Sequence, residues 1–426
     1  MNLSLLKQKS FRLLVLGSFV SQMGTLIQQF ALSLYVLKTT GSGALFATVI
    51  AAGMIPRLVF GPFGGVLADK LDRKTTFVSL DFVSGLVTLM FSVLYITNGR
   101  LAFHEILIYV MILQVINAFF EPAISTVIPS IVEKTELMSA NAFISTLRQI
   151  AMVISPMVAG VLFGTYGLFT VMLINGISFM LSGASEMFIE MPSMEKNDTP
   201  LTAKLVMRDF KIGIDFIKGT KVVLAILLLG VFVNFAFSGM FSIILPYTLI
   251  QKYGVSESRF GIYMSIVFIG MVIGPALGAL WSRRASTERI IIVGMSLVGA
   301  MMVGLSVYMS PIFSGIYHSQ MGVMLGTGGF IFVTCLLIAV INVCISTLFQ
   351  QIVPLEVMGR VGGVFSTLIM ASSPVGQMLF GALLDRIDPY VGFAFAGICA
   401  LIGVTVFKRL TSTKTKDRAI ADPVLK

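Results

Sequence analysis

Charged residues are scarce in this chain of 426 residues. Asp, Glu, Lys and Arg together make up 12% of it, whereas 56% of the residues are hydrophobic. This balance excludes a soluble globular domain of ordinary composition, in which about a quarter of the residues are charged. A helix that spans a bilayer needs about 20 predominantly apolar residues, and the chain contains many such runs. The composition therefore predicts an all-α membrane protein that crosses the bilayer many times.

Cysteine and histidine are also rare, with three and two residues respectively. Cys335, Cys344 and Cys399 fall within apolar runs and none belongs to a CxxC pair, so we expect packing rather than a metal site or a disulfide. His104 and His318 lie in expected outer loops, far from any partner in sequence. The sequence thus predicts no metal site and no cofactor. It also lacks the catalytic constellation that a polytopic membrane enzyme would need.

The net charge of +10 is explained by where the basic residues lie. With the N-terminus in the cytoplasm, 23 of the 30 Lys and Arg fall in cytoplasmic segments, five in outer loops and two, Arg57 and Arg148, within spans. This bias follows the positive-inside rule. It predicts a multi-pass plasma-membrane protein with both termini cytoplasmic, and no nucleic-acid partner. The first apolar run is too long for a signal-peptide core, so we expect it to be the first span.

Twelve apolar runs divide the chain into two halves. Spans are expected near residues 11–37, 44–68, 77–97, 103–130, 137–164 and 166–189, and then near 222–251, 257–282, 289–310, 320–350, 358–384 and 388–407. We therefore predict six-helix bundles over residues 1–189 and 222–407, and a cytoplasmic tail over 408–426. Residues 190–221 are expected to be a cytoplasmic linker. Its later part places apolar residues at helical spacing, which predicts an amphipathic helix on the membrane surface, while a flexible charged linker is the alternative for 190–203.

The two halves of the sequence repeat one another. A shift of 213 positions places Phe60–Asp69 on Ile273–Ser282, so that a Gly-Pro pair, a later Gly and a Leu coincide. Both stretches run into basic residues at an expected cytoplasmic turn. Parallel six-helix repeats are typical of a large class of secondary transporters. Ser282 stands where the first copy has Asp69, so we do not expect the halves to be functionally equivalent.

Residues Gly65 to Lys74 read GVLADKLDRK. They resemble the signature loop G-x-L-a-D-r-x-G-r-K between the second and third helices of the major facilitator superfamily. Lys70 replaces an arginine and Asp72 replaces the second glycine, a variant that resembles the drug:proton antiporter branch containing the macrolide efflux pumps. Residues Ser155 to Gly160 resemble the antiporter motif of that branch only loosely, because its first glycine is missing. The resemblance implies twelve helices in the major facilitator fold and transport by alternating access.

The same resemblance implies a conformational latch. In the family, the acidic residue of the loop docks on the N-terminal end of the eleventh helix, where the helix dipole is positive. This role falls to Asp69, with Gly65 allowing another helix to approach closely and Arg360 adding a full charge at the start of the expected eleventh helix. Arg73 and Lys74 are either partners in the latch or only determinants of topology.

Few ionisable residues lie within the expected spans, where each is energetically costly. Glu121 is the deepest carboxylate, and Arg57 and Arg148 lie near the middle of their spans. Glu121 is a candidate to bind a proton in competition with one of these arginines, which makes all three proton-coupling candidates, or else it forms a static ion pair with one of them. Asp81, one to two turns from the end of the third span, is a fourth candidate. Asp81 and Glu186 are, however, close enough to helix ends to reach polar headgroups.

The resemblance also places a substrate cavity between the halves, lined by the first, fourth, seventh and tenth helices. Its candidate residues are amides and aromatic side chains: Gln22, Gln28, Gln29, Asn117, Phe120, Asn234, Phe237 and Asn342. The 26 methionines and 34 phenylalanines offer adaptable surface for varied lipophilic ligands. We predict a monomeric secondary transporter that exports lipophilic or amphipathic compounds, of macrolide or multidrug type, in exchange for protons. A siderophore exporter or lipid flippase of the same fold, or a polytopic membrane enzyme, are the alternatives.

Overall fold

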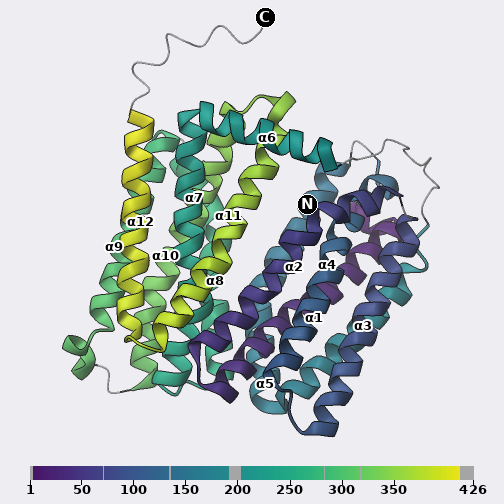
Figure 1. The fold of residues 1–426 in the computed structure, drawn as a ribbon, viewed down its shortest axis with the longest axis horizontal. Helices are drawn as coiled ribbons and strands as arrows, with labels where there is room; N and C mark the ends of the chain where they lie inside the picture. Colours follow the sequence, from purple (N-terminus) through teal and green to yellow (C-terminus); the bar gives the residue numbers. More distant parts are fainter. Residues whose placement is uncertain are drawn as a thin grey trace, which may run out of the picture. The chain divides into compact units, whose positions relative to one another are not determined.

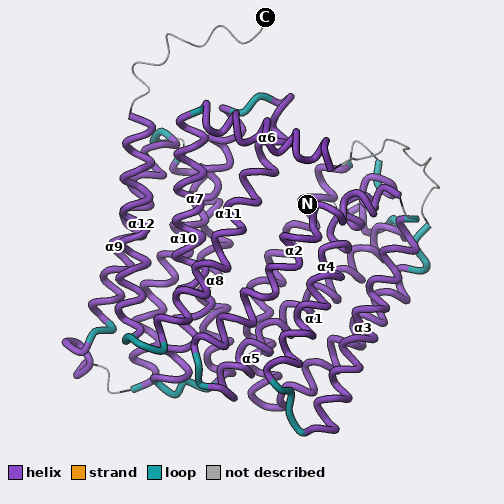
Figure 2. The backbone as a smooth tube through the Cα atoms, viewed as in Figure 1, coloured by secondary structure: helices purple, strands orange, loops and turns teal. Residues whose placement is uncertain are grey.

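The computed structural model describes residues 3–70, 72–133, 136–190, 203–282, 284–316 and 319–412. These residues are almost entirely helical and include no strand (Figures 1 and 2). Helices suit a bilayer because each backbone N–H and C=O finds its partner within the same segment. The α-helices are α1 (Lys9–Thr40), α2 (Gly43–Lys70), α3 (Arg73–Asn98), α4 (Phe103–Ile131), α5 (Leu137–Glu186), α6 (Ala203–Gly219), α7 (Lys221–Gly239), α8 (Glu257–Trp281), α9 (Thr287–Tyr308), α10 (Gln320–Ile352), α11 (Leu355–Leu384) and α12 (Pro389–Ser412).

The number of membrane crossings follows from the lengths of these helices. Ten of the described helical segments are long and apolar enough to span a membrane, and Gly43–Pro56 of α2 is a shorter apolar helix. α5 has 50 residues, or about 75 Å of helix, whereas a bilayer core is about 30 Å thick. It is broken at Gly167, whose φ of 78° is a left-handed conformation that glycine adopts without steric cost. α5 therefore supplies two spans, and the twelve predicted crossings are confirmed.

The chain forms two compact units. The first comprises Met1–Pro200 together with Leu249–Ile266, and the second comprises Leu201–Thr248 together with Val267–Lys426. α7 is extended by π-helical turns over Met240–Ile244 and Tyr247–Lys252. The end of this extension and the first part of α8 thus pack with α1–α5. The predicted limits of the bundles, linker and tail follow the sequence order and stay a prediction.

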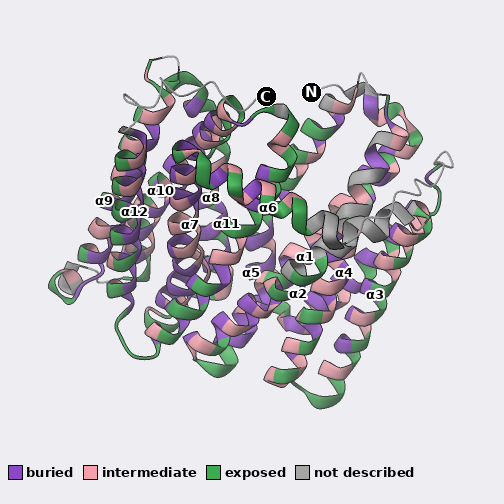
Figure 3. Ribbon diagram, turned by 45° about the horizontal axis from the view of Figure 1, so that its top comes forward, coloured by how far each residue is buried: buried purple, intermediate pink, exposed green. Residues whose placement is uncertain are grey.

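In the first unit, α1 and α3 pack against α5, and α2 packs against α4. Glycines allow the closest approaches. A Cβ atom on Gly17 or Gly24 of α1 would collide with side chains of α5, and one on Gly85 of α3 would lie 3.1 Å from the Gly176 carbonyl oxygen. Small residues at crossing points are the usual means by which membrane helices pack closely. Buried and exposed positions alternate around these helices, so each presents one face to its neighbours (Figure 3).

In the second unit, α7 packs against α11 and α12, and α9 packs against α10 and α12. α6 lies across the ends of α7 and α11 (Figure 1). Its Ile217 is buried in a cluster with Val223 and Val364, whereas Met207 stays exposed. A helix is thus present in the later part of the predicted linker, and part of its apolar face packs on protein because these two helix ends offer apolar partners.

Candidate functional site

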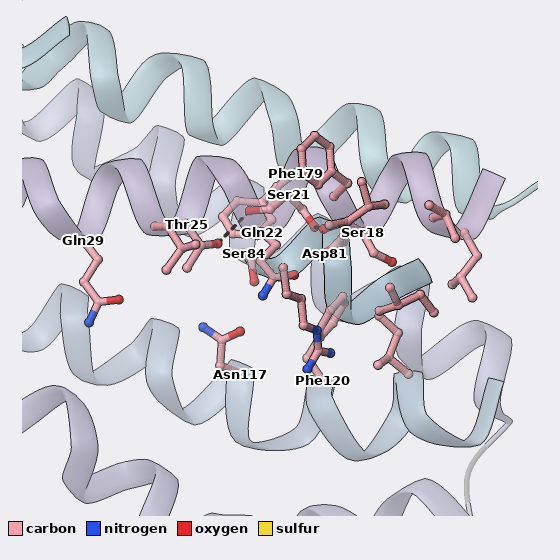
Figure 4. Close-up of a pocket in the computed structure, with 18 of the residues that line it drawn as sticks. Ser18, Ser21, Gln22, Thr25, Gln29, Asp81, Ser84, Asn117, Phe120 and Phe179 are labelled. Atoms are coloured by element: carbon pink, nitrogen blue, oxygen red, sulfur yellow. Dashed lines mark hydrogen bonds between the residues drawn. The ribbon is translucent and has the colours of Figure 1, made fainter. Parts of the chain in front are cut away.

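A cavity of about 200 Å³ lies in the first unit, among α1, α3, α4 and both segments of α5. It brings together six residues predicted from the sequence: Gln22, Gln29, Asp81, Asn117, Phe120 and Arg148. Gln22 and Gln29 project from α1, and Asn117 and Phe120 project from α4 into the same space (Figure 4). The cavity therefore combines amide groups with aromatic surface.

Helical spacing explains why α1 contributes so many polar groups to the cavity. Ser18, Gln22, Thr25 and Gln29 follow one another at intervals of four, three and four residues, which places them on one face of the helix. Gln114 and Asn117 of α4, three residues apart, face the same cavity. Amides donate and accept hydrogen bonds, so this lining can bind both carbonyl and hydroxyl groups of a ligand.

Gln28 lies on a different face of α1 from its neighbour Gln29. It is 2% exposed and accepts a hydrogen bond from Asn175 Nδ2 over 2.8 Å. It also lines a smaller cavity of about 40 Å³ with Gln29 and Asn117. Its carbonyl oxygen is thus engaged by α5, and Gln28 chiefly ties α1 to α5.

The polar network around Gln28 was not predicted. Tyr109 of α4 donates to Thr88 Oγ1 of α3 over 3.1 Å, and Ser178 donates to the Asn175 carbonyl over 2.8 Å. Each of these residues is ordinary in a membrane helix, and only the bonds between helices, from Tyr109 to Thr88 and from Asn175 to Gln28, distinguish them. Spacing along single helices carries no signal of that meeting.

Three of the predicted cavity residues belong to the second unit. Asn234 donates to the Gly230 carbonyl of its own helix over 3.2 Å. Phe237 is buried beside Phe241, with 6.2 Å between the ring centroids. Asn342 of α10 is exposed. Of these three, Asn342 therefore has the most accessible side chain for a ligand.

The proton-coupling candidates differ in their surroundings. Arg148 is exposed at the cavity wall, with no described carboxylate in ion-pair contact. The side chains of Glu121 and Arg57 lie outside the described residues, so their pairing stays a prediction. Asp81 and Glu186 are both buried. The expectation that these two reach polar headgroups is wrong, because α3 and α5 pack tightly at this level.

A second group of contacts joins α1 and α5 to the segment Leu249–Ile266. Lys38 Nζ lies 2.7 Å from Glu257 Oε1, and Gln251 Nε2 donates to the Leu37 carbonyl over 2.7 Å. The ring of Phe30 stacks on that of Phe260 with 5.8 Å between centroids. These contacts tie the start of α8 to α1 by charge, hydrogen bonding and apolar packing.

Known proteins show the same architecture. The family model of the Major Facilitator Superfamily matches residues 14–377 and, in a second match, residues 227–422. The chain belongs to this superfamily. It is therefore a multi-span membrane transporter rather than an enzyme, and the predicted fold is confirmed.

Relatives within the superfamily include exporters. Macrolide efflux protein A of Streptococcus pyogenes is 25% identical over 396 residues, which cover 91% of this chain and 93% of that protein. Enterobactin exporter EntS of Escherichia coli O1:K1 / APEC is 24% identical over 422 residues, covering 94% and 92%. A solved bacterial homologue of the iron transporter ferroportin in its inward-facing state has a TM-score of 0.72 at 15% identity, covering 97% of this chain and 100% of that chain, which supports the fold alone.

The superfamily latch falls mostly outside the described side chains. The burial of Gly65 and the side chains of Asp69 and Arg73 are outside the description, and Lys74 is partly exposed. Arg360 forms an ion pair with Asp209 of α6, with 3.0 Å between Nε and Oδ1. The latch stays a prediction, and the structure adds a partner for Arg360 that the sequence did not suggest.

Proposed function

We propose that this superfamily member exports lipophilic or amphipathic compounds of macrolide type in exchange for protons. The observation that carries the proposal is the cavity of the first unit, in which amide side chains face phenylalanine rings. Such a lining suits a ligand with a large apolar body and scattered oxygen atoms. The similarity to Macrolide efflux protein A over 91% of the chain supports the same class of substrate.

The size of the cavity limits what it can hold alone. Sites for drug-sized ligands are commonly about 300–1,000 Å³, and the cavity measures about 200 Å³. It would therefore take one end of such a ligand. Asn234, Phe237 and Asn342 of the second unit are the candidates to bind the remainder. Alternating access would expose the ligand to each side of the membrane in turn, and Asp69 and Arg360 would stabilise the form closed to the cytoplasm.

The proposed setting is the plasma membrane, with both termini in the cytoplasm and a monomer as the working unit. The distribution of basic residues supports this orientation. Labelling of single cysteines placed in the tail and in the Gly99–Arg100 turn would test it. We expect the tail to react only after the membrane is permeabilised and the turn to react in intact cells.

Transport into inverted membrane vesicles tests the function directly. Vesicles that contain the protein should accumulate a labelled macrolide when the lumen is made acidic, and an ionophore that dissipates the pH gradient should abolish the accumulation. Vesicles without the protein provide the background. Accumulation that is insensitive to the ionophore would exclude proton coupling.

The same vesicles separate the alternatives. The similarity to the enterobactin exporter makes a siderophore the second candidate substrate. Enterobactin uptake without macrolide uptake would replace the proposed substrate. Movement of a fluorescent lipid between leaflets, with neither solute transported, would indicate a flippase.

A further inference from the structure

Two carboxylates are buried in the first unit, and they are the only charged side chains among the buried residues that the structure describes. Asp81 of α3 is 1% exposed and Glu186, at the end of α5, is 0% exposed. An ionised carboxylate is costly to bury unless a cation or several hydrogen-bond donors face it. The surroundings of the pair therefore decide its protonation.

Ser182 connects the two carboxyl groups. Its hydroxyl donates to Glu186 Oε1 over 2.9 Å, and the same hydroxyl contacts the carboxyl group of Asp81. A hydroxyl has only one hydrogen to donate, so a bond to Glu186 leaves only lone pairs for Asp81. An ionised Asp81 has no hydrogen for those lone pairs. Both contacts are attractive only when one of the carboxyls carries a proton, whichever way the hydrogen bonds run.

No described cation compensates the pair. α1 presents the uncharged residues Gly17 and Ser18 toward the pair, and its Arg12 is exposed. Arg148 of α5 is exposed at the cavity wall and forms no ion pair with either carboxylate in the described part of the chain. From α4, Phe120 faces the cavity, and the side chain of Glu121 is outside the description. The charged group that acts on Glu186 is Asp81 itself.

The pair also has unused bonding capacity. Asp81 Oδ2, Glu186 Oε2 and Ser18 Oγ are buried without a hydrogen-bond partner among the described residues. Ser18 and Asp81 line the end of the cavity opposite Gln29 (Figure 4). Glu186 does not line the cavity. The backbone of α1 packs closely against Glu186, since a Cβ on Gly17 would lie 3.2 Å from Glu186 Oε1.

We propose that Asp81, Ser182 and Glu186 form the proton site of this transporter and hold one proton between the two carboxyls. Asp81 exchanges the proton with water in the cavity, and Glu186 lies behind it as the inner partner. Release of the proton to that water leaves two carboxylates facing each other in a buried site. Their repulsion favours separation of α3 from the second segment of α5, so proton occupancy biases the packing of these helices. The inference rests on the proposed proton-driven export and assigns its coupling to this pair.

Transport by reconstituted protein provides the first test. With the membrane potential clamped at zero, exchange of one proton supports at most about tenfold accumulation of a neutral macrolide per unit of pH difference. We expect wild-type protein to approach this limit. Exchange of labelled for unlabelled macrolide in the same liposomes needs no proton gradient and provides the reference. Relative to that exchange, Asp81→Asn and Glu186→Gln should lose proton-driven accumulation. Ser92→Ala is the matched control, because Ser92 is a buried α3 hydroxyl that donates to the Thr88 carbonyl of its own helix and bonds to no other helix among the described residues. Proton-driven accumulation at the wild-type level in both carboxyl variants would overturn the proposal.

Infrared difference spectroscopy of purified protein provides the second test and does not depend on transport. A protonated buried carboxyl has a carbonyl stretch distinct from that of a carboxylate. We expect such a band at neutral pH in wild type. It should be shifted in Asp81→Asn and in Glu186→Gln, each of which keeps one buried carboxyl, and lost when the two substitutions are combined. It should also be shifted in Ser182→Ala, which keeps both carboxyls and guards against misfolding of the other variants. Absence of the band in wild type would overturn the proton site even if export is proton-driven. A normal band together with accumulation that the pH gradient does not affect would instead refute the proposed function. Accumulation that a sodium gradient drives, and that Asp81→Asn abolishes, would show that sodium rather than a proton binds at this site.

Discussion

The two units of this transporter differ in how their buried side chains bond to one another. In the described part of the second unit, buried hydroxyls donate to backbone carbonyls, and Thr327, Thr334 and Thr411 do so to the carbonyl four residues earlier in their own helix, over 2.7 to 2.9 Å. In the first unit, some buried side chains bond to side chains of other helices, as Asn175 does to Gln28 and Tyr109 does to Thr88. Local bonds satisfy a hydroxyl without constraining any neighbour. Bonds between helices make the packing of one depend on the state of the other.

The difference extends to charge. Asp81 and Glu186 are buried in the first unit, and no charged residue is buried in the described part of the second. The sequence repeat shows the same trend, since Ser282 occupies the position of Asp69. The described part of the first unit thus buries two carboxyl groups, whereas that of the second buries hydroxyls and an amide but no charged side chain. Substitutions in each unit test this contrast.

Helix packing should give the largest effect, and it should be larger at Gly376 of the second unit than at Gly24 of the first. A Cβ on Gly376 of α11 would collide with the backbone carbonyl of Phe235, whereas one on Gly24 of α1 would meet the side chains of Asn175 and Ser178. Backbone cannot rotate away, so we expect Gly376→Ala to destabilise the protein by about 3 kcal/mol and Gly24→Ala by less. Thermal unfolding in detergent, followed by size-exclusion chromatography, measures both. Equal melting temperatures for the two variants would contradict the distinction.

Ligand recognition should depend more on the first unit. Removing an amide that bonds a bound ligand costs about 1–2 kcal/mol, or roughly a 5- to 30-fold weaker affinity. We expect this loss for Asn117→Ala and a smaller one for Asn342→Ala. Equilibrium binding of a labelled macrolide to purified protein measures it, with Asn98→Ala, exposed at the end of α3, as the matched control. A larger loss for Asn342→Ala would move the main recognition site to the second unit.

The contrast in hydrogen bonding predicts a smaller difference in stability. Asn175→Ala leaves the buried Gln28 oxygen without its partner, which should cost about 1 kcal/mol in a membrane protein. Thr334→Val removes only a bond within α10 and should be nearly neutral. Denaturation in mixed detergent compares the two variants. A cost for Thr334→Val that matches that of Asn175→Ala would show that local and cross-helix bonds do not differ here.

The smallest difference between the units concerns the caps of two helices at corresponding turns. Asp72 Oδ1 accepts from Thr75 N over 2.7 Å at the start of α3, and Ser286 Oγ accepts from Arg289 N over 3.4 Å at the start of α9. The hydrogen bonds from Thr75 hold the pKa of Asp72 below its ordinary value of 3.8. The stabilisation of the folded protein by the ionised Asp72 is therefore complete above pH 3.8. It is lost as the pH falls through the lower pKa that Asp72 has in the folded state.

We expect Asp72→Ala to cost about 1 kcal/mol at neutral pH and progressively less in acid. Ser286→Ala should cost a similar or smaller amount at every pH. Melting temperatures recorded between neutral and strongly acidic pH separate the two. A cost for Asp72→Ala that does not change with pH would show that the carboxylate charge is irrelevant to the cap.

Much of the site follows from position along single helices. Gln22 and Gln29 could be assigned to the cavity, as could Asn117 and Phe120, because 3.6-residue periodicity places residues that are three, four or seven apart on one face. The same reasoning does not show that Gln28, which is next to Gln29 in sequence, bonds to Asn175 and lines only the smaller cavity. Adjacent residues point about 100° apart on a helix, and sequence alone does not say which direction meets the cavity.

The class of the protein could be predicted from twelve apolar runs, the bias of basic residues and the loop of residues 65–74, because hydrophobic length and charge placement act locally along the chain. Which polar groups meet depends on how the helices pack. Asp81 and Glu186 are separated by more than a hundred residues, and each alone has the position of a residue near the membrane surface. Their burial around Ser182 depends on how α1, α3 and α5 cross, and helix crossing is set by the shapes of all the side chains and glycines at the contact.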